Sequence, residues 1–233
     1  MKPFLYTLVI AACLSLMLWA QPTTTTAKGV VAGASGNGSV PLMPEQCRPG
    51  KTSPETLGWR WKPGTVVKVY FLKDNFTEAE TDALAHAVKN WNDALREINS
   101  RVFLVDSGTR EEVATSNASI TVLRGIPRVK KRVGETRFYS MSNGVIRLVI
   151  TINPIVTDLN ALTSLMTHEL GHSLGLADCY KCRRGTTAMA AFKSHNQGND
   201  VHSPSACDKY VVALGYANET NTQARVEQIQ QGH

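Results

Sequence analysis

The sequence predicts an α+β fold in which helices stack on a mixed β-sheet. The chief observation is the order of the hydrophobic patterns: strand, helix, strand, strand, hairpin and then two helical segments. A second observation is the composition, because 233 residues with 42% apolar content suit one globular domain with terminal extensions. No internal repeat is evident, which excludes solenoid architectures.

The first strand and the first helix have clear local signals. Residues 66–71 are β-branched and aromatic and therefore predict a strand. Thr77 and Glu80 form the pattern of a capping box, which predicts the start of a helix. The residues that then recur at helical spacing form a predicted core stripe: Leu84, Ala87, Val88, Trp91 and Leu95.

Four further strands are predicted before the last helices. Residues 102–105 and 120–123 are short apolar runs. Residues 137–141 and 145–152 flank Asn143-Gly144, a dipeptide typical of a hairpin turn. Thr157 or Asp158 can cap the next helix, and we expect the final helix to begin at Ser203-Pro204.

The N-terminus has the features of a signal peptide over residues 1–20. Lys2 provides a positive start, residues 4–19 are almost wholly apolar, and Ala20 is a small residue suited to cleavage. A retained membrane anchor and a lipoprotein attached at Cys13 are the alternatives. Residues 21–58 are predicted to be a flexible segment, residues 59–217 the folded domain, and residues 218–233 a polar tail.

The charge distribution does not indicate a nucleic-acid-binding protein. The net charge is +6, and the basic residues are not interleaved with aromatic residues in a binding stripe. A basic loop lies between residues 124 and 137, and it is either a solvated connection or a rim that favours acidic or extended substrates.

The cysteines outside the signal region are even in number: Cys47, Cys179, Cys182 and Cys207. In an exported chain this count predicts disulfides, and four cysteines allow three pairings. Cys179 and Cys182 are also spaced like half of a structural zinc site or like a redox pair. Cys47 could alternatively bind a metal in a latent form of the protein.

The segment His168-Glu169-Leu170-Gly171-His172 carries the main functional signal. Residues four apart lie on one face of a helix, so His168 and His172 can hold one metal ion. Glu169 is rotated away from that face of the helix and is free to act as a general base toward water. This arrangement predicts a zinc-dependent peptide hydrolase.

A third ligand is needed, because a catalytic zinc site takes three protein ligands and one water. Gly175 is suited to end the helix and reverse the chain, which would bring Asp178 back to the metal. His195, His202 and Cys179 are the other candidates. Tyr180 is either an additional group that assists the reaction or a packing residue.

The stretch from His168 to Asp178 resembles the metzincin clan of zinc endopeptidases, in the snapalysin-like form with aspartate as third ligand. Met189 stands where these proteins have the methionine turn beneath the metal. The layout of residues 59–216 resembles a matrixin-like catalytic domain. The resemblance implies a five-stranded, mostly parallel sheet with an antiparallel edge strand, and a small C-terminal subdomain with the methionine turn and final helix. Residues 137–141 would then be the edge strand that binds substrate.

We therefore predict a secreted zinc metalloendopeptidase with its catalytic domain at residues 59–217. His168, His172 and Asp178 are the predicted Zn²⁺ ligands, and Glu169 is the predicted general base. The expected partner is a protein or peptide in extended conformation, and we expect a monomer without nucleic acid or stable membrane association after signal cleavage. The alternatives are an inactive zinc-containing binding module and a hydrolase of small peptides or amides.

Overall fold

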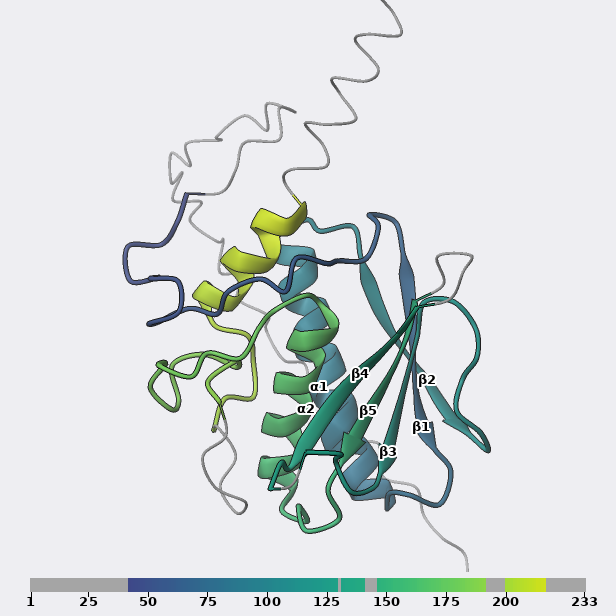
Figure 1. Cartoon of the computed structure of the whole chain (residues 1–233). Helices are drawn as coiled ribbons and strands as arrows, with labels where there is room; N and C mark the ends of the chain where they lie inside the picture. Colours follow the sequence, from purple (N-terminus) through teal and green to yellow (C-terminus); the bar gives the residue numbers. More distant parts are fainter. Residues whose placement is uncertain (1–41, 130, 141–145, 192–199, 217–233) are drawn as a thin grey trace, which may run out of the picture. The chain divides into compact units, whose positions relative to one another are not determined.

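The computed structural model describes residues 42–129, 131–140, 146–191 and 200–216 (Figure 1). Its sheet contains β1 (Val66–Leu72), β2 (Phe103–Arg110), β3 (Ser119–Arg124), β4 (Gly134–Ser140) and β5 (Ile146–Ile152). The strand order is β2-β1-β3-β5-β4. All neighbouring strands are parallel except β4, which runs antiparallel to β5 at the edge. A mostly parallel sheet with an antiparallel edge strand is therefore confirmed.

The edge strands are longer than predicted, or shifted from the predicted positions. β2 continues to Arg110, although its second half is polar, because it pairs along β1 and faces solvent. β4 begins at Gly134 rather than at residue 137 and pairs with β5 from Ile152 to Ile146. The predicted hairpin turn at Asn143-Gly144 lies outside the described residues.

Helix α1 (Glu78–Glu97) begins where the sequence predicts. The Thr77 hydroxyl accepts the backbone N–H of Glu80, and the Glu80 carboxylate accepts the backbone N–H of Thr77, so both halves of the capping box are present. All five residues of the predicted core stripe are buried. The helix is long enough to connect the parallel strands β1 and β2 across one face of the sheet.

Helix α2 (Leu159–Ser173) lies beside α1 on the same face of the sheet (Figure 1). Two hydrogen bonds join the helices: Trp91 Nε1 donates to Thr167 O over 2.8 Å, and Thr163 Oγ1 donates to Ala83 O over 3.0 Å. The core lies between the helices and the sheet and includes fully buried residues of both, such as Trp91, Leu165 and Ile150. α2 is thereby held with its C-terminal half in the interior.

The final helix covers residues 206–216, so it begins later than the predicted start at Ser203-Pro204. The reason is a reciprocal cap: the backbone N–H of Asp208 donates to Ser205 Oγ, and the backbone N–H of Ser205 donates to the Asp208 carboxylate. The pattern of Ser205 followed three residues later by an acid is readable in the sequence. Pro204, however, favoured the preceding Ser203 as the predicted cap.

Residues 42–58, which fall in the segment predicted to be flexible, are attached to the folded domain at two places. A disulfide joins Cys47 to Cys207 in the final helix. Backbone hydrogen bonds connect Glu55 and Leu57 to the residues just after α2. Composition alone did not indicate these contacts, because both depend on residues more than a hundred positions away. In the described part of the chain, no helix is both long and apolar enough to span a bilayer.

Candidate metal centre

The motif helix is positioned by its caps. Asp158, one of the two predicted caps, accepts the backbone N–H of Ala161 through Oδ1 at 2.8 Å. At the other end the backbone N–H of Leu176 donates to Gly171 O and that of Gly175 donates to His172 O, the two bonds of a Schellman motif. His168 and His172 therefore lie on the last two turns of a helix with both ends defined.

Gly175 reverses the chain after α2, as the sequence predicts. Its φ is +90°, a conformation that side chains other than glycine rarely adopt. A Cβ at this position would also lie 2.2 Å from the carbonyl oxygen of Trp59. Both the backbone angle and the neighbouring chain thus require glycine here, and the turn directs Asp178 back toward the two histidines.

The N-terminal segment 55–59 runs alongside this turn and holds it. Leu57 N–H donates to Gly175 O over 2.7 Å, and Ala177 N–H donates to Glu55 O over 2.8 Å. Thr56 and Leu176 form an antiparallel bridge between these bonds. The backbone immediately before Asp178 is therefore paired with another segment rather than left as a free loop.

His168, His172 and Asp178 converge on one point. The Oδ1 atom of Asp178 lies 3.1 Å from His168 Nε2 and 3.5 Å from His172 Nε2. One potential ligand atom from each of the three residues lies within 4.8 Å of the others. Donor atoms at about 2.1 Å from a tetrahedral zinc ion are separated by about 3.4 Å, so the two distances to Asp178 Oδ1 fit such an ion.

The two imidazole rings are oriented by backbone carbonyls. His168 Nδ1 donates to Ala188 O and His172 Nδ1 donates to Leu176 O, each over 2.8 Å. Because a carbonyl can only accept, each Nδ1 carries a proton, and each Nε2 is the ring nitrogen that faces Asp178. This is the arrangement typical of histidines that bind metals through Nε2.

The electrostatics of the three groups favour a cation. Burial alone would raise the pKa of Asp178, but the hydrogen bonds and charges of His168 and His172 outweigh it and hold that pKa well below its usual range. Burial alone would lower the pKa of His172, but its hydrogen bond with Asp178 and the charges of Glu169 and Asp178 raise it. The Tyr180 hydroxyl also donates to Asp178 Oδ2 over 3.1 Å. The Asp178 carboxylate is thus held ionised, with one oxygen toward the histidines.

Glu169 is buried on the side of α2 that faces β4. Thr136 Oγ1 donates to Glu169 Oε2 over 2.6 Å, and a Cβ on Gly134 would lie 2.3 Å from Glu169 Oε1. The edge strand therefore approaches the carboxylate closely at a glycine and orients it through a threonine. Neither contact was predicted, because nothing in the local sequence around Gly134 and Thr136 points to a residue some thirty positions later.

Met189, the residue of the predicted methionine turn, packs against the motif helix. Its side chain is fully buried, and its sulfur would lie 2.2 Å from a Cβ added at Gly171. The preceding residue, Ala188, provides the carbonyl that orients His168. The floor of the site and one of its imidazoles are therefore positioned by the same turn.

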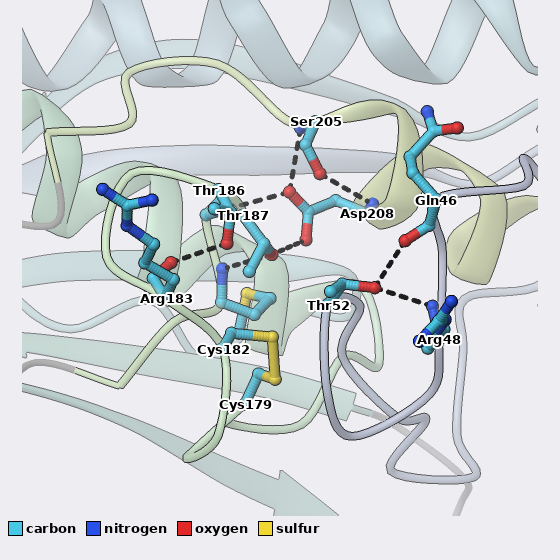
Figure 2. The surroundings of a disulfide bond; sticks show 12 residues. Gln46, Arg48, Thr52, Cys179, Cys182, Arg183, Thr186, Thr187, Ser205 and Asp208 are labelled. Atoms are coloured by element: carbon cyan, nitrogen blue, oxygen red, sulfur yellow. Dashed lines mark hydrogen bonds between the residues drawn. A yellow bond between two sulfur atoms is a disulfide. The ribbon is translucent and has the colours of Figure 1, made fainter.

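The buried Asp208 carboxylate fixes that turn (Figure 2). It accepts the backbone N–H of Ala188 over 2.9 Å and the hydroxyl of Thr187, and it also caps the final helix through Ser205. Figure 2 shows these bonds converging on Asp208 beside the second disulfide, Cys179–Cys182. Asp208 is not among the site residues that the sequence predicts, although its position three residues after a serine was a usable signal.

The remaining candidate ligands do not join the site in the described part of the chain. Cys179 is bonded to Cys182, and Cys47 to Cys207, so no thiol of these four is free for a metal. His202 is exposed and is not part of the metal-binding group, although its carbonyl accepts from Asn90 and Thr167. His195 lies outside the described residues.

Comparison with known proteins finds no family model that matches the chain and no curated protein that matches its sequence. Among solved structures the chain is similar to metalloproteinase-II from Bacteroides fragilis, with 14% identity and a TM-score of 0.40, over 72% of this chain and 57% of that one. It is also similar to a chain of a chaperone–substrate complex, with 12% identity and a TM-score of 0.38, over 67% of this chain and 35% of that one. The chain thus spans between a third and three fifths of the length of these two chains. At this level of similarity, the residues of the site are the basis for any functional conclusion.

Proposed function

We propose that this protein is a secreted zinc-dependent metalloendopeptidase. The observation that supports this most directly is the convergence of His168 Nε2, His172 Nε2 and Asp178 Oδ1, with both imidazoles oriented by backbone carbonyls. Two nitrogen donors and one carboxylate match the ligand set of a catalytic zinc site, which leaves a position for water. When bound there, zinc supplies a Lewis acid for peptide hydrolysis.

The neighbouring residues support a hydrolytic role. Glu169 follows a proposed ligand directly in the helix, and Thr136 holds its carboxylate in place. We assign Glu169 to accept a proton from the attacking water and to deliver it to the leaving amine. Tyr180 and the 55–59 segment position Asp178, and Met189 supports the helix from below.

The two disulfides support action in an oxidising compartment, which fits secretion. We propose an extended peptide as substrate, because β4 is an edge strand beside the site and can pair with one more strand. We further propose that one chain is sufficient for activity, because all the residues assigned above belong to a single chain.

Replacing Glu169 with Gln tests the base directly. We expect Glu169→Gln to retain one equivalent of zinc and the fold, and to lose activity on denatured casein by about a hundredfold or more, the usual effect of removing a general base. Glu112→Gln, at an exposed loop position, is the matched control and should keep full activity.

Metal analysis of the purified protein and chelation with o-phenanthroline complete the test. Activity that disappears on chelation and returns with zinc supports the proposal. Bound zinc without cleavage of any denatured protein would instead indicate a binding module, and cleavage of dipeptides alone would indicate a small-peptide hydrolase.

A further inference from the structure

The face of β4 that borders the metal centre carries alternate residues of the strand. Thr136 bonds to Glu169, Gly134 lies against the same carboxylate, and Phe138 packs on Trp59. Side chains alternate along a strand, so these three residues share one face. β4 has β5 as its sole partner in the described sheet, so its other edge can accept an extended peptide.

The C-terminal end of this face is apolar. Phe138 and Trp59 stack edge to face with ring centroids 4.7 Å apart, and Phe138 remains 41% exposed. Leu57 is 47% exposed and belongs to the segment that pairs with Gly175. Aromatic and aliphatic surface therefore stays open to solvent beside a polar site, which is typical of a surface that binds apolar side chains.

The N-terminal end of β4 is basic. Arg128, Lys131 and Arg132 are exposed in the loop that leads into the strand, and none of them has an ion-pair partner among the described residues. The loop backbone is held in place, because Arg132 N–H donates to Val129 O over 3.2 Å and Asn153 Nδ2 donates to Arg132 O over 3.3 Å.

Arg132 lies close to the metal centre along the chain. It precedes Gly134 by two positions, and a Cβ on Gly134 would lie 2.3 Å from Glu169 Oε1. A substrate residue that extends past the start of β4 would therefore pass beside Arg132.

We propose that this site selects peptides with an apolar residue before the scissile bond and an acidic residue after it, through Phe138 and Trp59 on one side and Arg132 on the other. The scissile bond lies opposite Gly134 and Thr136, which contact Glu169. A peptide paired antiparallel to β4 places its preceding residues toward Phe138 and its following residues toward Arg132, and antiparallel pairing is the more stable of the two arrangements. This inference rests on the proposed function and names its substrate class.

A set of fluorogenic peptides tests the preference. The peptides share one sequence and carry Glu, Gln or Lys at the second residue after the cleaved bond, and Phe or Ala at the second residue before it. We expect kcat/KM to be about fivefold higher for Glu than for Lys, the effect of an exposed charge pair, and to fall with added salt as such pairs are screened. Arg132→Glu should reverse the Glu-over-Lys preference, and Phe138→Ala should reduce the Phe-over-Ala preference by about fivefold.

Lys68→Glu makes the same charge change at an exposed position on β1 and should leave the preference of the wild type unchanged. Equal rates for the Glu and Lys peptides, or an unchanged preference in Arg132→Glu, would overturn the inference. The opposite order, with acid favoured before the bond, would overturn it as well.

Binding measurements separate this inference from the proposed function. Glu169→Gln with zinc bound is titrated with the same peptides, and the ratio of affinities for Glu and Lys peptides is compared with and without Arg132→Glu. Failure of the wild type to cleave casein would reject the protease, whereas an affinity ratio near one would reject the role of Arg132. A ratio of about fivefold that is lost in Arg132→Glu would support that role even if cleavage is not seen.

Discussion

At the scale of single residues, Gly175 shows how a proposed metal ligand depends on the backbone before it. The turn after α2 needs a positive φ and also needs space, because the Trp59 carbonyl occupies the position of a Cβ. Asp178 reaches the histidines only if this turn keeps its shape. Substitution of Gly175 therefore tests the stability of the fold and the binding of the metal together.

Gly175→Ala should be more destabilising than the same change at Gly64. The two glycines have nearly equal φ values, +90° and +88°, but a Cβ at Gly64 meets nothing within 4 Å. We expect Gly64→Ala to lower the free energy of unfolding by about 1–2 kcal/mol, the cost of left-handed backbone for a residue with a Cβ. Gly175→Ala should cost at least about 1 kcal/mol more, because the chain must also move away from Trp59.

Urea unfolding and zinc titration of both variants check this prediction. Zinc affinity should fall in Gly175→Ala and stay unchanged in Gly64→Ala, since only the first turn carries a proposed ligand. Equal losses of stability together with equal zinc affinity would show that the Trp59 contact does not position Asp178.

At the scale of elements, Glu80 joins the start of α1 to the end of β3. Its carboxylate closes the capping box and also accepts from Arg124, and both side chains are mostly buried, with 16% and 13% exposure. Arg124 in turn donates to the carbonyls of Asn153 and Val156 in the connection from β5 to α2. The Glu80–Arg124 ion pair thus links the N-terminal regions of both helices to the same end of the sheet, where β3 and β5 finish.

The contribution of Glu80 to the free energy of unfolding should decrease as the pH falls. Burial alone would raise the pKa of Glu80, but its bonds with Thr77 and Arg124 outweigh it, so the pKa lies below the ordinary value of 4.5. A lowered pKa means that the carboxylate stabilises the fold above this ordinary value and that the stabilisation is lost as the pH falls through the lowered one. We expect Glu80→Gln to cost about 1–3 kcal/mol at pH 7 and progressively less below pH 4.5.

Glu78→Gln is the control, because Glu78 is an exposed acid in the same first turn and should cost under about 1 kcal/mol. Unfolding curves of the three proteins at pH 7 and at decreasing acidic pH measure the difference. A loss of unfolding free energy in Glu80→Gln that does not decrease as the pH falls would contradict an ionised pair between Glu80 and Arg124.

At the scale of the whole molecule, the two disulfides constrain very different lengths of chain. Cys47 and Cys207 are separated by 160 positions, and their bond attaches the N-terminal segment to the final helix. Cys179 and Cys182 are three positions apart and close a short loop between Asp178 and the turn that carries Met189. In the chain-entropy view, the longer loop provides the larger stabilisation.

Removal of each disulfide should therefore have unequal effects. We expect the double change Cys47→Ala and Cys207→Ala to lower stability by about 3–5 kcal/mol, against about 2 kcal/mol for Cys179→Ala and Cys182→Ala. Thermal unfolding of both variants, each saturated with zinc, provides the comparison. A larger loss in the Cys179 and Cys182 variant would show that the short loop matters through local contacts rather than through chain entropy.

Local patterns in the sequence were enough for the elements that carry the site. The capping box at Thr77, the core stripe of α1, the Asp158 cap and the glycine turn are all visible within a few positions, because helix periodicity and caps are short-range properties. The same holds for the spacing of His168, His172 and Asp178, which one helix and one turn bring together. The sequence by itself therefore determined which residues could meet around a metal.

Tertiary structure alone decided what holds those residues in place. Thr136 on the edge strand orients Glu169, Asp208 in the final helix fixes the turn beside His168, and the disulfide partners are far apart in the chain. Each of these contacts joins segments whose separation has no periodicity and no local signature. They arise only when the sheet order and helix packing are known, because the distance between two side chains then depends on the whole fold rather than on their spacing in sequence.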